Sequence, residues 1–211
     1  MLAFMPLPAH DSQLVQIVDA SLADAARCAG DLLACRIGCT QCCHGAFAIN
    51  ALDAERLRAG MSALHATRPA LAAAIEQRAY AWLGQYGGEF PGDTHTGVLG
   101  TSDADRARFD DFADNAACPA LDLDTGRCDV YQWRPMTCRV FGPPIRATGN
   151  DGSEGLGHCE LCFIGATPAE VAACEMPVPL ELEATLLDEM GRNGDKTGTK
   201  GETIVAFALV R

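Results

Sequence analysis

The residues of this chain that could do chemistry are its cysteines, which gather in two groups. Four fall within nine positions and three more follow at intervals of ten, at Cys35, Cys39, Cys42, Cys43, Cys118, Cys128 and Cys138. An apolar core needs apolar volume and gains little from sulfur, whereas thiolates are preferred ligands of zinc and of iron–sulfur centres. The pattern therefore predicts a metal centre, with these seven residues as candidate ligands.

The first group has a spacing that also occurs in radical S-adenosylmethionine enzymes. Cys35-x3-Cys39-x2-Cys42 matches their cluster-binding motif, and Gly87-Gly88-Glu89 imitates a motif that follows it. In those enzymes both motifs follow barrel strands, whereas here each follows a predicted helix. A chain of 211 residues also leaves little room for the barrel. This interpretation is therefore the weakest, and Gly87 is more simply a helix stop.

Two other interpretations remain, a zinc ion and a 4Fe–4S cluster. Zinc takes four tetrahedral ligands, often from pairs of closely spaced cysteines such as Cys39 and Cys42. The adjacent Cys42 and Cys43 fit one small ion poorly, because neighbouring side chains tend to diverge. A cluster is larger and accepts thiolates from separate segments. The spacing alone does not choose between zinc and iron.

The second group of cysteines lies in a longer motif. Its parts are Cys-Pro-Ala-Leu at 118–121, Cys-Asp-Val-Tyr at 128–131 and Arg-Pro-Met-Thr-Cys-Arg-Val-Phe at 134–141. Together with Cys-Thr-Gln-Cys-Cys at 39–43, this set resembles the YkgJ-type cysteine-cluster family, described as zinc- or iron-chelating domains. The resemblance implies a bacterial cytoplasmic protein with a metal centre. Most relatives have no assigned reaction.

Two arginines flank Cys138 and are the candidate cofactor-binding residues. Arg134 and Arg139 would offset the negative charge of a thiolate centre or hold an anionic substrate. Ion pairs with the neighbouring aspartates are the alternative. His44 follows Cys43 directly and is a possible additional ligand.

The remaining cysteines have no fixed assignment. Cys159-Glu-Leu-Cys162 is another close pair, and Cys174 follows it. These three could complete the main site, build a second one or stay free. Cys28 lies on the apolar stripe of a predicted helix, where we expect a small buried apolar side chain. Eleven cysteines, an odd count, fit a disulfide framework poorly.

The elements that must position these thiols are mainly helical. Apolar residues recur at helical spacing from Asp11, which we expect to cap the first helix. Periodicity and capping signals predict further helices at 53–57, 67–86, 103–112, from Thr167 onward and at 181–190. The pattern of residues 118–141 predicts a hairpin with its turn at 124–126 and a second strand at 130–131. The apolar residues at 203–210 predict a further strand.

The predicted fold is mainly α with irregular cysteine-rich loops and a small β-hairpin. We expect a single compact metal-centred domain over 1–190, with its core motifs at 35–141, then a polar linker and an apolar tail over 191–211. With 48% hydrophobic residues such a domain can bury a core without disulfide staples.

The charge and composition of the chain limit the partners and the cellular compartment that we expect for it. The net charge of −12 argues against nucleic acid or an anionic membrane as the main partner. No apolar run of eighteen residues occurs, so no membrane span is expected. The first ten residues lack the features of a secretory signal, which favours the cytoplasm, where thiols stay reduced.

Two classes of function follow from these observations. In the first, the chain binds a metal centre, more specifically a 4Fe–4S cluster, for redox or group-transfer chemistry on an anionic small molecule or a protein. In the second, zinc is structural, or the protein handles metal or serves as an interaction module without catalysis. The sequence holds no nucleophile paired with a base, so enzymatic activity stays open. An open ligand position beside Arg134 or Arg139 would favour a catalytic or redox role. A metal site closed to solvent would favour a structural role.

Overall fold

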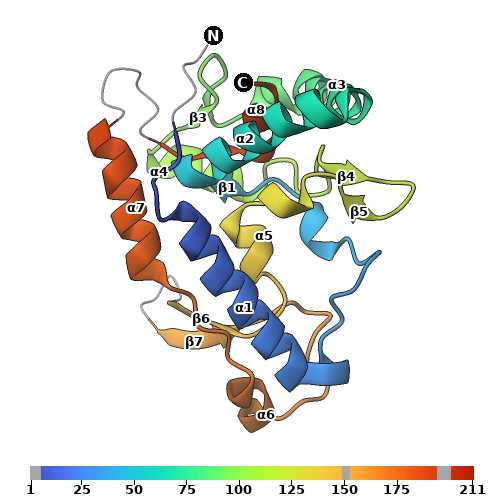
Figure 1. The fold of residues 1–211 in the computed structure, drawn as a ribbon, viewed down its shortest axis with the longest axis vertical. Coiled ribbons are helices and arrows are strands. Elements are labelled where there is room, and N and C mark those ends of the chain that lie inside the picture. Colours follow the sequence, from blue (N-terminus) through green and yellow to red (C-terminus); the bar gives the residue numbers. More distant parts are fainter. Residues whose placement is uncertain (1–5, 149–152, 194–200) are drawn as a thin grey trace. The chain divides into compact units, whose positions relative to one another are not determined.

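The computed structural model describes residues 6–148, 153–193 and 201–211, shown in Figure 1. It confirms a mainly helical fold with short antiparallel strand pairs. Contacts divide the chain into two compact units, which we describe separately. Unit 1 comprises Met1–Leu7, Thr40–Pro135 and Leu187–Arg211, and unit 2 comprises Pro8–Cys39 and Met136–Leu186.

Unit 1 is built on three helices that pack against one another. They are α2 (Ala51–Thr67), α3 (Pro69–Tyr86) and α8 (Val205–Val210) (Figure 1). Leu57, Ile75 and Leu209 lie buried in the core between them. Burial of one such aliphatic side chain stabilises the fold by about 2 kcal/mol. Unit 1 also contains α4 (Asp103–Asp110) and the short 3₁₀ helices η2 (Gln41–Cys43), η3 (Gly87–Glu89) and η4 (Tyr131–Trp133).

Helix α2 is longer than the predicted helix over 53–57. The Asn50 side chain caps it by accepting a hydrogen bond from the Asp53 backbone nitrogen at 3.0 Å. Its first two turns are buried on every side, including the Arg56–Asp53 ion pair at 2.6 Å. Charged residues are buried here together with apolar ones, so the apolar residues do not form a single stripe and periodicity did not reveal the length of the helix.

Three short antiparallel pairs complete unit 1. They are β1 (Ala48–Ile49) with β8 (Thr203–Ile204), β2 (Gly92–Asp93) with β3 (Val98–Leu99), and β4 (Leu121–Asp122) with β5 (Arg127–Cys128). The strand predicted at 203–210 was wrong beyond Ile204, because α8 begins at Val205. Nearly all of this segment is buried, and a short buried apolar run has the same composition in either form.

The predicted hairpin turn at 124–126 is confirmed between β4 and β5. Asp122 accepts hydrogen bonds from the Thr125 hydroxyl at 2.6 Å and from the Asp124 backbone nitrogen at 3.1 Å. Gly126 follows with φ at 66°, a value that favours glycine. The second strand holds Cys128 instead of residues 130–131, which lead into η4.

Unit 2 holds the first helix of the chain and several shorter elements. These are α1 (Asp11–Ala29), η1 (Gly30–Leu32), α5 (Met136–Val140), the antiparallel pair β6 (Ile145–Thr148) and β7 (Glu154–Gly157), and α6 (Pro168–Ala173). Helix α7 (Leu180–Asn193) belongs to unit 2 up to Leu186. The cap predicted for α1 was wrong by one residue: His10 is the N-cap, and Asp11 is the first helical residue.

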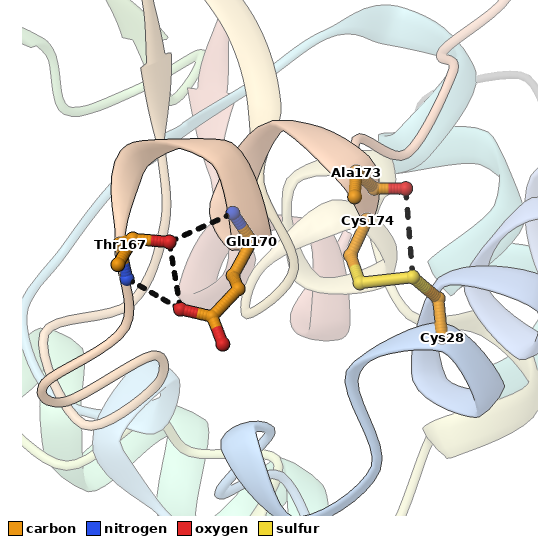
Figure 2. Close-up of a disulfide and its surroundings, with 5 residues drawn as sticks. All are labelled: Cys28, Thr167, Glu170, Ala173 and Cys174. Atoms are coloured by element: carbon orange, nitrogen blue, oxygen red, sulfur yellow. Dashed lines mark hydrogen bonds between the residues drawn. A yellow bond between two sulfur atoms is a disulfide. The ribbon is translucent and has the colours of Figure 1, made fainter.

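A disulfide between Cys28 and Cys174 joins the last turn of α1 to the end of α6, with 5.5 Å between the Cα atoms (Figure 2). Cys28 is exposed, so the prediction of a buried small apolar side chain was wrong. The capping box predicted at Thr167 is confirmed. Thr167 Oγ1 accepts from the Glu170 nitrogen, and Glu170 Oε2 accepts from the Thr167 nitrogen.

The polar linker predicted from 191 lies largely outside the described residues, at 194–200. Within the described part of the chain, no helix combines the length and the apolar character that a membrane span requires.

Candidate metal centre

Four of the seven predicted thiols, those of Cys42, Cys43, Cys118 and Cys128, belong to unit 1. The first two lie on η2, which closes when the Cys43 nitrogen donates to the Thr40 carbonyl at 2.8 Å. The Cys118 nitrogen then donates to the Cys43 carbonyl at 2.7 Å. This backbone contact brings together two segments that are far apart in the sequence.

The hairpin brings Cys128 to the same place. The Cys118 carbonyl accepts from the Leu121 nitrogen at 2.9 Å, and Leu121 is the antiparallel partner of Cys128. The Asp129 nitrogen also donates to the Ala120 carbonyl at 2.8 Å. Cys118 and Cys128 thus lie at the base of one hairpin, both packed against the core of unit 1.

The four thiols lie within electrostatic reach of one another. The Cys43 thiol donates a hydrogen bond to the Cys42 sulfur. Cys118 and Cys128 each interact electrostatically with both members of this pair. The adjacent cysteines therefore do not diverge in the way expected from the sequence, because the 3₁₀ turn directs both toward the same partners.

The four thiols differ in how readily they ionise. The hydrogen bond from Cys43, together with the charges of Arg134 and His44, lowers the pKa of Cys42 to about 6. The same bond raises the pKa of Cys43. Burial raises the pKa of Cys118 to about 12 and also raises that of Cys128. Three of the four thiols thus need a bound cation to become thiolates, whereas Cys42 ionises without one.

We predict that Cys42 is the most reactive of these four thiols in metal-free protein. Only the thiolate is alkylated, so its rate should rise with pH and reach half of its maximum near pH 6. An unperturbed cysteine reaches that point near about pH 8.5. Mass spectrometry after short iodoacetamide pulses measures each site. Cys42→Ser should remove the low-pH phase, and persistence of that phase would contradict the assignment.

Arg134 lies beside this group of thiols. Its side chain is 7% exposed, its Nη1 donates to the Tyr131 carbonyl at 3.0 Å, and its guanidinium carbon lies 3.9 Å from the centre of the Tyr131 ring. Its charge lowers the pKa of both Cys42 and Cys128. Arg134 is therefore placed to offset thiolate charge.

Arg139 and His44 have other partners. Arg139 is 1% exposed and belongs to unit 2, where its Nη1 donates to both carboxylate oxygens of Asp19 at 2.7 and 2.8 Å. Arg139 thus forms an ion pair, as considered from the sequence, but its partner Asp19 is distant in the sequence and is not one of the neighbouring aspartates considered there. The exposed His44 donates from Nδ1 to the Thr40 carbonyl at 3.0 Å.

Sequence reasoning missed Arg78, on α3. Its Nε donates to the Pro119 carbonyl at 2.9 Å, and its Nη2 donates to Asp129 Oδ2 at 2.6 Å. These two acceptors directly follow Cys118 and Cys128 in the sequence. Arg78 therefore fixes both ends of the segment that carries two candidate ligands. No sequence motif indicates this role of Arg78, because 41 and 51 positions separate it from its two partners.

The other three predicted thiols, Cys35, Cys39 and Cys138, belong to unit 2. Cys138 lies on α5, directly before Arg139. Cys35 and Cys39 lie near Cys159 and Cys162, the pair left without an assignment by the sequence.

The donor set of unit 1 fits a soft metal. In their present side-chain conformations, the described residues contain no group of three or more His, Cys, Asp or Glu that could hold a metal ion. Cysteine has a single rotatable side-chain bond to its sulfur, so thiols that are already neighbours can be brought onto a common centre by rotation about χ1. Four such thiols suit zinc or iron–sulfur clusters and suit hard cations poorly.

The surroundings of Cys118 offer little space for a substrate. The cavity that it lines with Phe47 and Trp82, among others, has a volume of about 20 Å³. Such a volume holds about one water molecule.

Comparison with known proteins identifies one family. A family model named CxxCxxCC and described as "Putative zinc- or iron-chelating domain" matches residues 34–152, more than half of the chain. The match contains all seven predicted ligands together with Arg134 and Arg139, and it ends before Cys159. No curated protein and no solved structure matches the chain.

Proposed function

From the premise that this chain belongs to the CxxCxxCC family of zinc- or iron-chelating domains, we propose that unit 1 binds a 4Fe–4S cluster and transfers electrons. The family supports chelation of zinc or iron through cysteines. The 4Fe–4S identity and the redox role are our proposal, and the contacts within unit 1 support them.

The observation that carries the proposal is the meeting of the four thiols of Cys42, Cys43, Cys118 and Cys128. A 4Fe–4S cluster is commonly held by four cysteine thiolates, and its iron atoms offer separate positions to two thiols from adjacent residues. A single zinc ion would need both vicinal sulfurs within one coordination sphere. The set of four thiols therefore fits a cluster, and the choice of the cluster over zinc is our proposal.

Arg134 supports the same centre electrostatically. Four thiolates around a cluster carry negative charge, and a buried guanidinium beside Cys42 and Cys128 offsets part of it. Positive charge and hydrogen bonds near the sulfurs set the reduction potential of a bound cluster. Such a cluster supplies one-electron transfer, while this chain binds and shields it.

The arginines fit electron transfer better than catalysis on an anionic substrate. Arg134 and Arg139 are both buried, and both donate hydrogen bonds within the protein. A guanidinium that recognises a substrate would be expected to face an accessible cavity. Electron transfer needs no substrate at the metal, and the half-buried Cys42 and Cys43 leave the centre near the surface.

We also propose a cytoplasmic location, since free thiols persist in a reducing compartment. In the described part of the chain, nine of the eleven cysteines form no disulfide, in line with this placement. The Cys28–Cys174 disulfide is the observation that weighs against it.

Metal and sulfide analysis of protein purified without oxygen tests the function. We expect about four iron and about four acid-labile sulfide per chain, with broad visible absorption that bleaches on reduction. Zinc in place of iron in unit 1, without sulfide or colour, would contradict the cluster. That outcome would support the alternative of a structural or metal-handling zinc protein, for which the packing of Cys118 and Cys128 against the core is the favouring observation.

A further inference from the structure

We infer that unit 2 holds a second metal centre, a structural zinc ion bound by the thiolates of Cys35, Cys39, Cys159 and Cys162. The inference goes beyond the centre proposed for unit 1. Two of these ligands lie outside residues 34–152, the part of the chain that the family model matches.

The first pair lies in the loop that follows α1 and η1. The Leu32 carbonyl accepts from the Phe163 nitrogen at 2.7 Å, which joins the start of this loop to the segment that carries the second pair. The Cys39 nitrogen donates to the Arg36 carbonyl at 2.9 Å and closes a turn in which Gly38 has φ at 91°. This turn brings Cys39 back within electrostatic reach of Cys35.

The second pair lies in a tight turn of its own. The Cys162 nitrogen donates to the Cys159 carbonyl at 2.8 Å, and the Cys159 nitrogen donates to the Gly142 carbonyl at 3.1 Å. Gly142 has φ at 124°, and a Cβ atom there would lie 2.6 Å from the Cys35 sulfur. One glycine thus binds Cys159 through its backbone and leaves room for the sulfur of Cys35.

The two pairs are in contact. The Cys35 thiol donates a hydrogen bond to Cys162, and Cys39 and Cys159 are within electrostatic reach of it. Cys159 in turn interacts with Cys162 and Cys39. Four thiols from two turns therefore lie within electrostatic reach of one another in a single unit, and rotation about χ1 would bring them onto one ion.

Their spacing and burial suit a closed zinc site. Structural zinc commonly takes two cysteine pairs separated by two to four residues, and these pairs are separated by three and by two. Cys159 and Cys162 are 5% and 1% exposed and pack with Ala29 and Phe163 in an apolar cluster. The burial of this pair favours a structural role for the site, while Cys35 is exposed and Cys39 is half-buried.

Binding requires no oxidant or reductant. Each thiol loses its proton to solvent as the sulfur bonds to Zn²⁺, and the filled site keeps a net negative charge. Because unit 2 is small and has one long helix, a metal staple beside its disulfide is a common way to stabilise such a unit.

The test measures zinc, iron and sulfide together in three proteins: the full chain, Cys159→Ser/Cys162→Ser, and Cys42→Ser/Cys43→Ser. The full chain should hold about one zinc. That zinc should disappear from the first variant and persist in the second. Iron and sulfide should behave in the opposite way. Cobalt in place of zinc should give the visible bands of a tetrahedral thiolate site in the full chain but not in the first variant.

Failures of the two proposals look different. Zinc that persists beside iron and sulfide in Cys159→Ser/Cys162→Ser, or a full chain with iron and sulfide but no zinc, would overturn the second centre alone. Zinc that depends on residues 159 and 162, without any iron or sulfide, would overturn the cluster of unit 1 alone. The matched control is Cys28→Ser/Cys174→Ser, which removes two other cysteines of unit 2 and should keep its zinc.

A second measurement covers the case in which a variant does not fold. In the native full chain, Cys35, Cys39, Cys159 and Cys162 should resist alkylation until a zinc chelator is added, and all four should then react together. A hydrogen bond alone would not respond to a chelator, so protection of the exposed Cys35 that ends on chelation would require a bound metal. Rapid labelling of Cys35 before chelation would overturn the assignment.

Discussion

Cys128→Ala is expected to abolish metal retention in unit 1 and to destabilise the fold. Cys128 is one of four thiols that meet there, and its backbone pairs with Leu121 in the hairpin. Without its sulfur the centre lacks a ligand, and burial still raises the pKa of Cys118, which opposes its ionisation without a metal. A ligand present at a thousandfold excess over its Kd stabilises a protein by about 4 kcal/mol, and this contribution would be lost.

The measurement is iron, zinc and sulfide content with a denaturant titration, each before and after chelation. Cys28→Ala is the control, and its metal content should stay unchanged because Cys28 is bonded to Cys174. After chelation the difference in stability between Cys128→Ala and the parent protein should shrink to the packing contribution of one side chain, about 1 kcal/mol. Full retention of iron or zinc in unit 1 by Cys128→Ala would remove this residue from the centre.

The candidate ligands could be predicted from the sequence, because residue type alone decides which side chains bind soft metals. Thiols select soft metals whatever fold surrounds them, so Cys42, Cys43, Cys118 and Cys128 could be proposed from the sequence. The division of the cysteines between the two units could not be predicted in this way. Local spacing places Cys35 and Cys39 with Cys42, whereas the structure places Cys39 in unit 2 and Cys42 in unit 1. Contacts between distant segments decide this division, and spacing does not contain them.

The fold, like the site, was predictable from local signals and not where contacts between distant segments decide the structure. Elements with local signals were predicted, such as the capping box at Thr167 and the turn at 124–126. The first turns of α2 and most of α8 are buried on every side, so apolar periodicity did not reveal the length of α2 or the helical form of α8. The disulfide was missed because its cysteines are 146 positions apart and only the tertiary fold brings them together.

Arg78 is the residue whose role depends most on tertiary structure, and Arg78→Met should weaken metal binding while every ligand stays in place. Arg78 donates to Pro119 and Asp129, the residues directly after Cys118 and Cys128. Its loss frees the segment that carries both thiols and leaves the Asp129 carboxylate, which raises the pKa of Cys128, without this ion pair. Removal of such supporting contacts lowers metal affinity by about 10- to 100-fold.

Competition with a chelator measures this effect, and Arg127→Met is the matched control. Arg127 is exposed and adjacent to Cys128, so its replacement removes the same charge at a similar place in the sequence. Equal weakening in the two variants would show that charge alone matters and that Arg78 has no positioning role.

The variant Asp129→Asn separates position from charge. It removes the carboxylate beside Cys128 but leaves the bond from Arg78 to Pro119. If Arg78 acts partly by neutralising Asp129, Arg78→Met should cost less affinity when combined with Asp129→Asn than in the parent protein. The loss that remains in the double variant measures the contribution of the bond to Pro119, which holds the residue after Cys118 in place.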